Sequence, residues 1–209
     1  MRLTIFGASG QTGRLITQQA LEQGHDVTVV LRRPPDDVDA RASVRVIPSL
    51  DDTAAVRAAL AGADAALSGI GPRKRADAPV AAPATRAILR AADGMGLRLV
   101  VISAAPVEPP PADDSFVSRR IALPLIGVLL RPVYDDLREM ERSLRGSDAV
   151  WTAFRPPMLT SGRATGNYRT RVGGSVPRGF TVSRADLADA MLASVGRPET
   201  ERAAVGIAD

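Results

Sequence analysis

The chain has no cysteine, a single histidine (His25) and a single lysine (Lys74), and only 3% of its residues are aromatic. Without cysteine it has no disulfide, no thiol nucleophile and no cysteine metal site. One histidine cannot form a histidine cluster, so we expect no metal centre. A Ser-His-Asp triad would have to use His25, which stands in a predicted turn and is expected to be solvated. No basic stripe is interleaved with aromatic residues, so no nucleic-acid partner is expected.

Long hydrophobic runs are also scarce. The longest, residues 121–130, is too short to span a bilayer and contains Pro124. Strand-like sequence begins at Arg2, so we expect no signal peptide, no membrane partner and a cytoplasmic location. The 209 residues, 45% hydrophobic and 24% charged, fit one globular domain that is either a monomer or a homodimer.

What the sequence does contain is a regular alternation of apolar strands and amphipathic helices. Strands that are apolar throughout indicate a parallel sheet covered on both faces, and right-handed crossovers then predict a doubly wound, Rossmann-type α/β fold. After the sixth strand the pattern becomes less regular. We therefore predict a small irregular substrate lobe at about residues 155–182, with short strands at 166–172 and 178–182. The six main strands are predicted at residues 2–6, 26–31, 43–47, 63–70, 97–104 and 149–154.

Three predicted helices have specific signals. Asp52 or Thr53 can cap a helix that ends near residue 62. Ser183 can cap a helix over residues 183–196, with Asp186 three residues further on. A long helical region is predicted over residues 116–144, after a proline-rich loop.

A glycine-rich turn joins the first strand to the first helix. Gly7, Gly10 and Gly13 form the pattern G-x-x-G-x-x-G. Such glycines allow a tight turn, a close approach of backbone to pyrophosphate, and close packing of helix on strand. The helix N-terminus then offers free N–H groups to the phosphates, and the hydroxyls of Ser9 and Thr12 can add donors. The pattern predicts a dinucleotide site; the alternative is a tight turn that only needs small residues.

Two arginines, Arg32 and Arg33, follow the second strand, where NAD-specific proteins usually place an acidic residue. A guanidinium attracts the 2′-phosphate that a carboxylate would repel. A hydrogen bond to a charged group contributes about 1.5–3 kcal/mol, so one contact would favour NADP(H) at least tenfold. The alternative is that one or both arginines point to solvent.

An ordered set of segments resembles one known family. These segments are "IFGASGQTG" with "DVTVVLRR", "DDLREMERSL", "RPPMLTSGRATGNY" and "VSRADLADAML". Together they resemble the NAD(P)H-binding family of atypical short-chain dehydrogenase/reductases, which includes biliverdin-IXβ reductase, also a flavin reductase. The resemblance covers nearly the whole chain and implies NADPH bound along the carboxyl edge of the sheet.

The resemblance also implies positions for individual residues around the cofactor. The pyrophosphate would lie against Gly7, Ser9, Gly10, Gln11, Thr12 and Gly13, and the 2′-phosphate against Arg32 and Arg33. Adenine would contact Ser49 and Leu50. Beside the cofactor would lie Gly69, Ile70 and Gly71, and near the nicotinamide Ser103 and Ala104. The nicotinamide pocket would be flanked by Pro156, Pro157 and Met158.

Two side chains are candidates for chemistry. Tyr134 and Arg138 stand four residues apart on one helix face, in place of the Tyr-x-x-x-Lys pair of many short-chain dehydrogenases. We expect Tyr134 to be a half-buried helix residue more than a proton donor. Ser103 is predicted either to donate a hydrogen bond to the nicotinamide or the acceptor, or to cap a strand end. Asp135 and Asp136 are expected to be solvated helix charges.

The function expected from these features is an NADPH-dependent reductase. It would transfer hydride to a flat conjugated small molecule such as a flavin, a quinone or an aromatic polyketide-like compound, with the proton coming from water. One alternative is an NADP(H)-dependent biosynthetic tailoring enzyme, a ketoreductase, epimerase or dehydratase. Another is a non-catalytic NADP(H) redox sensor.

Overall fold

The structure is a computed structural model, and it describes residues 1–34, 37–72, 74, 77, 79–107 and 130–209. An eight-stranded sheet runs through it in the order β3-β2-β1-β4-β5-β6-β10-β8. Every neighbouring pair is parallel except β10 with β8. The strands are β1 (Arg2–Phe6), β2 (Asp26–Leu31), β3 (Ser43–Val46), β4 (Ala65–Ser68), β5 (Arg98–Ile102), β6 (Val150–Arg155), β8 (Arg169–Val172) and β10 (Ala203–Ala208).

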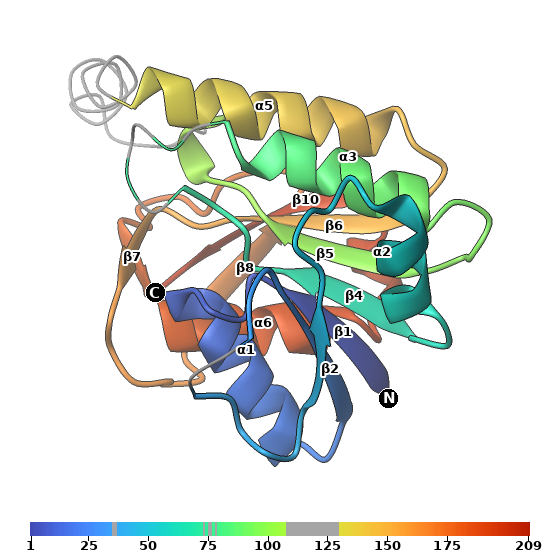
Figure 1. Cartoon of the computed structure of the whole chain (residues 1–209). Helices are drawn as coiled ribbons and strands as arrows, with labels where there is room; N and C mark the ends of the chain where they lie inside the picture. Colours follow the sequence, from blue (N-terminus) through green and yellow to red (C-terminus); the bar gives the residue numbers. More distant parts are fainter. Residues whose placement is uncertain (35–36, 73, 75–76, 78, 108–129) are drawn as a thin grey trace.

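Helices cover both faces of this sheet, as Figure 1 shows. The helices α1 (Gln11–Glu22) and α6 (Arg184–Ser194) pack together on one face. The other face carries α2 (Thr53–Leu60), α3 (Ala81–Ala91) and α5 (Arg131–Arg145). Each face has its own hydrophobic core: Ile16 and Leu187 belong to the first, and Ile88, Met140 and Trp151 to the second. Two short 3₁₀ helices, η2 (Ala105–Val107) and η4 (Pro198–Thr200), complete the helical elements named here.

The predicted doubly wound α/β fold is confirmed. The strand order reverses between β1 and β4, so connections run outward in both directions from the centre of the sheet. Ile5, Leu67 and Val100 are fully buried, as expected for strands covered on both faces. Ligands of such sheets bind outside the carboxyl ends of the strands, near the point where the order reverses.

The region after β6 differs in part from the prediction. The strand predicted at residues 166–172 is present as β8, but it joins the main sheet and not a separate lobe. A small parallel sheet of β7 (Met158–Thr160) and β9 (Thr181–Ser183) stands apart from it. The strands β7 and β10 were not predicted. The role of residues 155–182 as a substrate lobe stays a prediction.

The predicted caps are confirmed. Asp52 accepts a hydrogen bond from the N–H of Ala55 at the start of α2, and Ser183 accepts one from the N–H of Asp186 at the start of α6. Of the helical region predicted at 116–144, residues 116–129 lie outside the described part of the chain, as does most of the apolar run 121–130. In the part of the chain that is described, no helix has the length and apolar character needed to cross a membrane.

Candidate functional site

A cleft of about 660 Å³ opens at the carboxyl ends of β1, β2 and β4. Its lining comes from the glycine turn, from Arg32 directly after β2, and from the start of α3, which forms a wall of the cleft. Eight of the residues predicted to bind the cofactor line this cleft: Gly7, Ser9, Gly10, Arg32, Leu50, Gly69, Ile70 and Gly71.

Close backbone packing explains two of the glycines. Gly7 has a φ of +76°, and a Cβ there would lie 2.8 Å from the backbone of Gly69 and of Ile70. A Cβ on Gly13 would lie 2.1 Å from the carbonyl oxygen of Gly7. The end of β1, the start of α1 and the end of β4 can therefore meet only because these positions carry no side chain. Gly13 thus serves the packing of the turn, and it does not line the cleft.

The N-terminus of α1 is open to an anion. Its cap residue is Gly10, which has no side chain to accept from the first turn, and that turn contains no acidic residue. In contrast, side-chain carboxylates or hydroxyls accept from the first turns of α2, α3 and α6. Free N–H groups and the positive end of the helix dipole favour a phosphate at α1. The residues present therefore fit the pyrophosphate of a dinucleotide.

Arg32 and Arg33 are both exposed, and Arg32 lines the cleft. Neither arginine forms an ion pair with any residue that the structure describes. The only acidic residue of β2 is Asp26, at the start of the strand. The charges at its carboxyl end are therefore those of Arg32 and Arg33, which are positive. The site therefore suits an anionic group beside the ribose.

The other predicted cofactor residues lie outside the cleft lining. Ser49 is exposed and bonds the Asp51 carboxylate, which itself lines the cleft. The ends of β5 and β6 lie side by side, because the N–H of Ala105 donates to the carbonyl of Pro156 at 2.8 Å. This pairing brings together the two segments predicted to flank the nicotinamide. Contact with the cofactor stays a prediction for the eight residues of the cleft lining, and equally for Gln11, Thr12, Gly13, Arg33, Ser49, Ser103, Ala104, Pro156, Pro157 and Met158.

Sequence reasoning missed the wall formed by α3. Its residues Val80, Pro83, Ala84 and Ala87 line the cleft. The wall is held by Asp136 of α5, whose carboxylate accepts from three successive N–H groups, those of Val80, Ala81 and Ala82, at 2.8–2.9 Å.

The expectation that Asp136 is a solvated charge was therefore wrong. Its side chain is buried because it caps a neighbouring helix. Asp135 is solvated as expected, and it pairs with Arg131 and Arg138 on the surface of α5.

Tyr134 is more deeply buried than expected, at 6% exposure, in the core between α5 and the sheet. Burial raises the pKa of its phenol, and the charge of Arg138 offsets this only in part. The Arg138 guanidinium is itself held by the carbonyls of Pro106 and Val107 and by Asp135. This pair therefore lacks the lowered phenol pKa on which the tyrosine–lysine mechanism depends.

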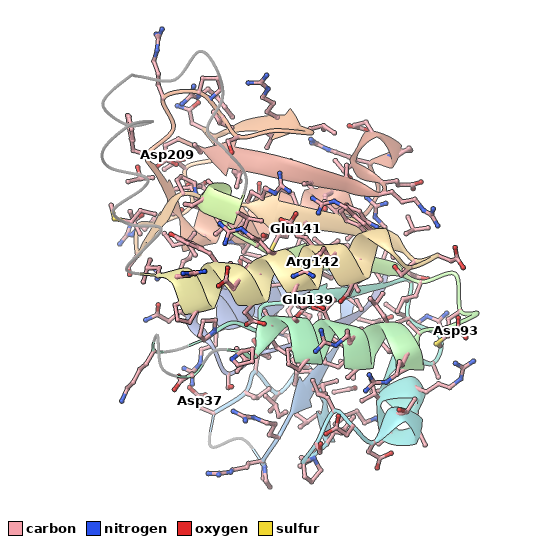
Figure 2. The ribbon with its side chains drawn as sticks, turned by 90° about the horizontal axis from the view of Figure 1, so that it is seen from above. Asp37, Asp93, Glu139, Glu141, Arg142 and Asp209 are labelled. Atoms are coloured by element: carbon pink, nitrogen blue, oxygen red, sulfur yellow. The ribbon has the colours of Figure 1, made fainter. Side chains whose placement is uncertain are left out.

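Ser103 takes part in a buried polar network that the sequence analysis did not anticipate. Its hydroxyl donates to Oε1 of Glu141 at 2.6 Å. The same carboxylate is bound by Nε and Nη2 of Arg155 and by Nη2 of Arg145. Figure 2 shows Glu141 on α5, on the opposite side of the helix from Glu139, which pairs with α3 through Arg86.

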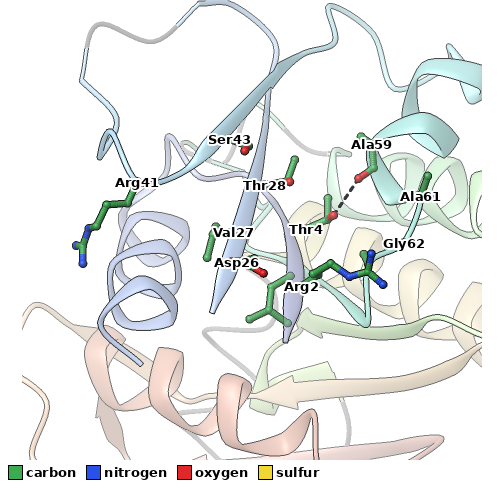
Figure 3. Close-up of a pocket in the computed structure, with 12 residues that line it drawn as sticks. Arg2, Thr4, Asp26, Val27, Thr28, Arg41, Ser43, Ala59, Ala61 and Gly62 are labelled. Atoms are coloured by element: carbon green, nitrogen blue, oxygen red, sulfur yellow. Dashed lines mark hydrogen bonds between the residues drawn. The ribbon is translucent and has the colours of Figure 1, made fainter. Parts of the chain in front are cut away.

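A second, smaller pocket of about 260 Å³ lies at the opposite, amino edge of the sheet (Figure 3). Its polar groups are used within the protein: the N–H of Arg2 donates to Asp64, and the Thr4 hydroxyl donates to the Ala59 carbonyl. Arg41 points away from the other lining residues. We assign it no function. Among the described residues, no group of three or more histidine and acidic side chains could hold a metal ion.

Comparison with known proteins decides the family. The model of the NAD(P)H-binding family matches residues 7–198, nearly the whole chain. The chain belongs to this family. The resemblance to atypical short-chain dehydrogenase/reductases, an oxidoreductase group, is thereby confirmed.

Solved structures show the same fold along the full chain. A protein of Burkholderia pseudomallei is 25% identical, with a TM-score of 0.83 and complete coverage of both chains. A Streptococcus pneumoniae protein, described as a candidate NADH-flavin reductase, is 20% identical, with a TM-score of 0.83 over 100% of this chain and 99% of that one. A short-chain dehydrogenase/reductase of Veillonella parvula, solved with NADP, is 19% identical, with a TM-score of 0.77 over 100% and 94%.

Curated relatives match only a segment. A Mycobacterium tuberculosis protein is 39% identical over 64 residues, which is 31% of this chain and 7% of the relative. The matched segment is thus a small part of a much longer protein, and the match carries no argument about function.

Proposed function

We propose that this protein is an NADPH-dependent reductase that transfers hydride to a flat, conjugated small molecule such as a flavin, a quinone or an aromatic polyketide-like compound. The observation that carries the proposal is the cleft at the carboxyl edge. It combines a helix N-terminus whose cap residue has no side chain with Arg32 at the end of β2, which forms no ion pair with any described residue.

NADPH is favoured over NADH by Arg32 and Arg33. A carboxylate at the end of β2 would accept from the ribose 2′-hydroxyl of NADH, and this chain has none there. A guanidinium binds phosphate by a planar fork of donors, which suits the additional 2′-phosphate of NADPH. The NADP-bound Veillonella parvula structure, which shares the fold, is compatible with this preference.

The acceptor is proposed to be one that needs no protein acid. Tyr134 is buried with a raised pKa, and the Ser103 proton is directed to Glu141. A flavin or quinone can accept hydride from bound NADPH and take its proton from water, so that the protein acts by positioning. The same two observations argue against a ketoreductase, which depends on a hydroxyl or phenol donor at the carbonyl.

The carboxyl edge also offers an apolar surface to such an acceptor. Met158 and Phe180 are 65% and 61% exposed, among the most exposed large hydrophobic side chains of the described residues. The N–H of Met158 donates to the carbonyl of Phe180 at 3.2 Å, which holds the two residues on adjacent segments. Met158 begins β7, shortly after β6, and Phe180 directly precedes β9; an exposed apolar pair in this position suits a flat ring system.

The proposal is tested with a panel of acceptors. Purified protein is supplied with NADPH under anaerobic conditions and with FMN, a naphthoquinone or an aliphatic ketone. We expect turnover with FMN or the quinone and none with the ketone. Reduction of the ketone alone would assign the protein to the tailoring enzymes instead. Binding of NADPH without turnover of any acceptor would support a sensor.

A further inference from the structure

Glu141 lies at the centre of the buried network, in the last turns of α5. It is 0% exposed, and Arg155 beside it is 1% exposed. Four hydrogen bonds reach its two carboxylate oxygens, from Ser103, from Arg145 and twice from Arg155. A buried carboxylate is stable only when its charge is paired and its oxygens are bonded, and both conditions are met here.

The network joins three elements at the edge where ligands bind. Ser103 directly follows β5, and Arg155 is the last residue of β6. The N–H of Ser103 donates to the carbonyl of Phe154 at 2.7 Å, so the two strand ends are also joined through their backbones. The described cleft holds the glycine turn and the β2 end, the features expected for pyrophosphate and adenosine. The nicotinamide half of a dinucleotide therefore extends toward β5 and β6.

The number of protons on Ser103 and Glu141 determines whether the Ser103 hydroxyl can donate or accept a hydrogen bond with a ligand. A serine hydroxyl has one proton and two lone pairs, and an ionised carboxylate has no proton to give. Because two guanidinium groups bond Glu141, its carboxylate is the acceptor and the Ser103 hydroxyl is the donor. The Ser103 N–H is also occupied. Ser103 is left with lone pairs only, and donation to an anion makes its oxygen a better acceptor.

We propose that Glu141 is a positioning residue that makes Ser103 a hydrogen-bond acceptor, and that Ser103 accepts from the carboxamide NH₂ of the nicotinamide. The proposal rests on the proposed function only in requiring a nicotinamide cofactor in this cleft. In this proposal Ser103 holds the nicotinamide ring. It does not donate a hydrogen bond to the molecule that receives the hydride. It also reverses the hydrogen-bond direction predicted for Ser103 from the sequence.

The test measures binding in the absence of any acceptor. Calorimetric titration compares NADP⁺ with its 3-acetylpyridine analogue, which keeps the carbonyl and lacks the NH₂ group. Wild-type protein is expected to bind NADP⁺ about three- to tenfold more tightly than the analogue, the range for one hydrogen bond. Ser103→Ala should bring this ratio close to one with little change in analogue affinity, and Ser103→Thr should restore it. Ser143→Ala, which removes a hydroxyl that bonds within α5, is the matched control.

Glu141→Gln tests the positioning role. Its amide can donate to Ser103 and release the serine proton, so the ratio should fall as it does in Ser103→Ala. A folded Glu141→Gln protein with the wild-type ratio, or equal ratios in wild type and Ser103→Ala, would overturn the proposal. Ser103→Ala removes a single hydroxyl and tests the claim even if Glu141→Gln does not fold. The readout is independent of turnover, so failure to reduce flavins would refute the proposed function and leave this inference intact.

Discussion

The carboxylate of Asp136 accepts a hydrogen bond from the N–H of Ala82 at 2.9 Å, joining α5 to the first turn of α3. An aspartate thereby occupies the N-terminus of α3, while the N-terminus of α1 has no side-chain cap. Of these two helix ends at the cleft, only that of α1 can receive a phosphate. Asp136 thus fixes the α3 wall and leaves the N-terminus of α1, at the glycine turn, as the one of these two helix ends that a phosphate can approach.

Removal of this cap should destabilise the protein. Asp136→Ala leaves three N–H groups at the start of α3 without their acceptor, and we expect a loss of about 2–3 kcal/mol in the free energy of unfolding. Urea denaturation measures the change. Asp135→Ala is the control: its carboxylate is exposed, and its loss should change stability by less than about 0.5 kcal/mol. Equal effects of the two variants would show that the cap contributes nothing.

Substitution of Gly13 should damage both fold and binding. In Gly13→Ala the new Cβ meets the Gly7 carbonyl oxygen, so the turn must shift. We expect about 1–3 kcal/mol of destabilisation and at least tenfold weaker NADPH binding. Gly71→Ala provides the comparison, because Gly71 lines the cleft itself but has nothing within 4 Å of its Cβ position. Thermal unfolding and NADPH fluorescence titration distinguish the two, and a Gly13→Ala protein that binds NADPH normally would contradict the close-packing argument.

The two arginines should set cofactor preference. In the double variant Arg32→Gln, Arg33→Gln, NADPH affinity is expected to fall about tenfold or more, while NADH affinity changes little, because only NADPH has the 2′-phosphate. Affinities of both cofactors are measured by titration. Arg41→Gln, at the amino edge, controls for the loss of one positive charge away from the cleft. An equal loss of affinity for NADPH and for NADH would mean that these arginines do not bind the 2′-phosphate.

The Glu141 network should make stability depend on pH in acid. Burial raises the pKa of Glu141, but hydrogen bonds from Arg155 and Ser103 and the charges of Arg155 and Arg145 outweigh it, so the net pKa is lowered from 4.5. A lowered folded-state pKa contributes stability that is present above the unfolded value of about 4.5 and is lost as the pH falls through the folded value. The difference in unfolding free energy between wild type and Glu141→Gln should therefore be constant near neutral pH and shrink below about pH 4.5. A difference that does not vary down to acid unfolding would contradict the assigned ion pairing.

Tyr134 should be dispensable for chemistry. Because its phenol is buried and its pKa is raised, Tyr134→Phe is expected to retain kcat within about twofold, with a small change in stability. Steady-state NADPH oxidation with FMN as acceptor measures kcat. A fall of a hundredfold or more in kcat, with the fold intact by circular dichroism, would identify the tyrosine as a proton donor and favour a tailoring enzyme.

The regular part of the fold was predictable because it depends on local sequence. Strands such as β2 and β5 are apolar throughout, and the caps Asp52 and Ser183 stand directly before their helices. β10 was missed because its sequence, Ala203–Ala208, is short and rich in small residues, and its pairing with β6 is a long-range contact.

That the glycine turn and Arg32 meet at one cleft was likewise predictable, since they lie within a single strand–turn–helix–strand unit. The Asp136 cap and the Glu141 network were not. Asp136 and Val80 are 56 residues apart, and Ser103 and Glu141 are 38 apart. In the sequence, both acids stand among the charges of an amphipathic helix, and no local pattern distinguishes a buried carboxylate from a solvated one. Only the packing of α5 on α3 and on the ends of β5 and β6 shows which acids turn inward.

Anaerobic oxidation of NADPH by the purified protein with FMN as acceptor, run beside NADH, tests the central claim most directly. The proposed function predicts flavin reduction with kcat/KM at least about tenfold higher for NADPH than for NADH, the preference that one charge-assisted contact to the 2′-phosphate supplies. Tight NADPH binding with no reduction of FMN or of a quinone would contradict it.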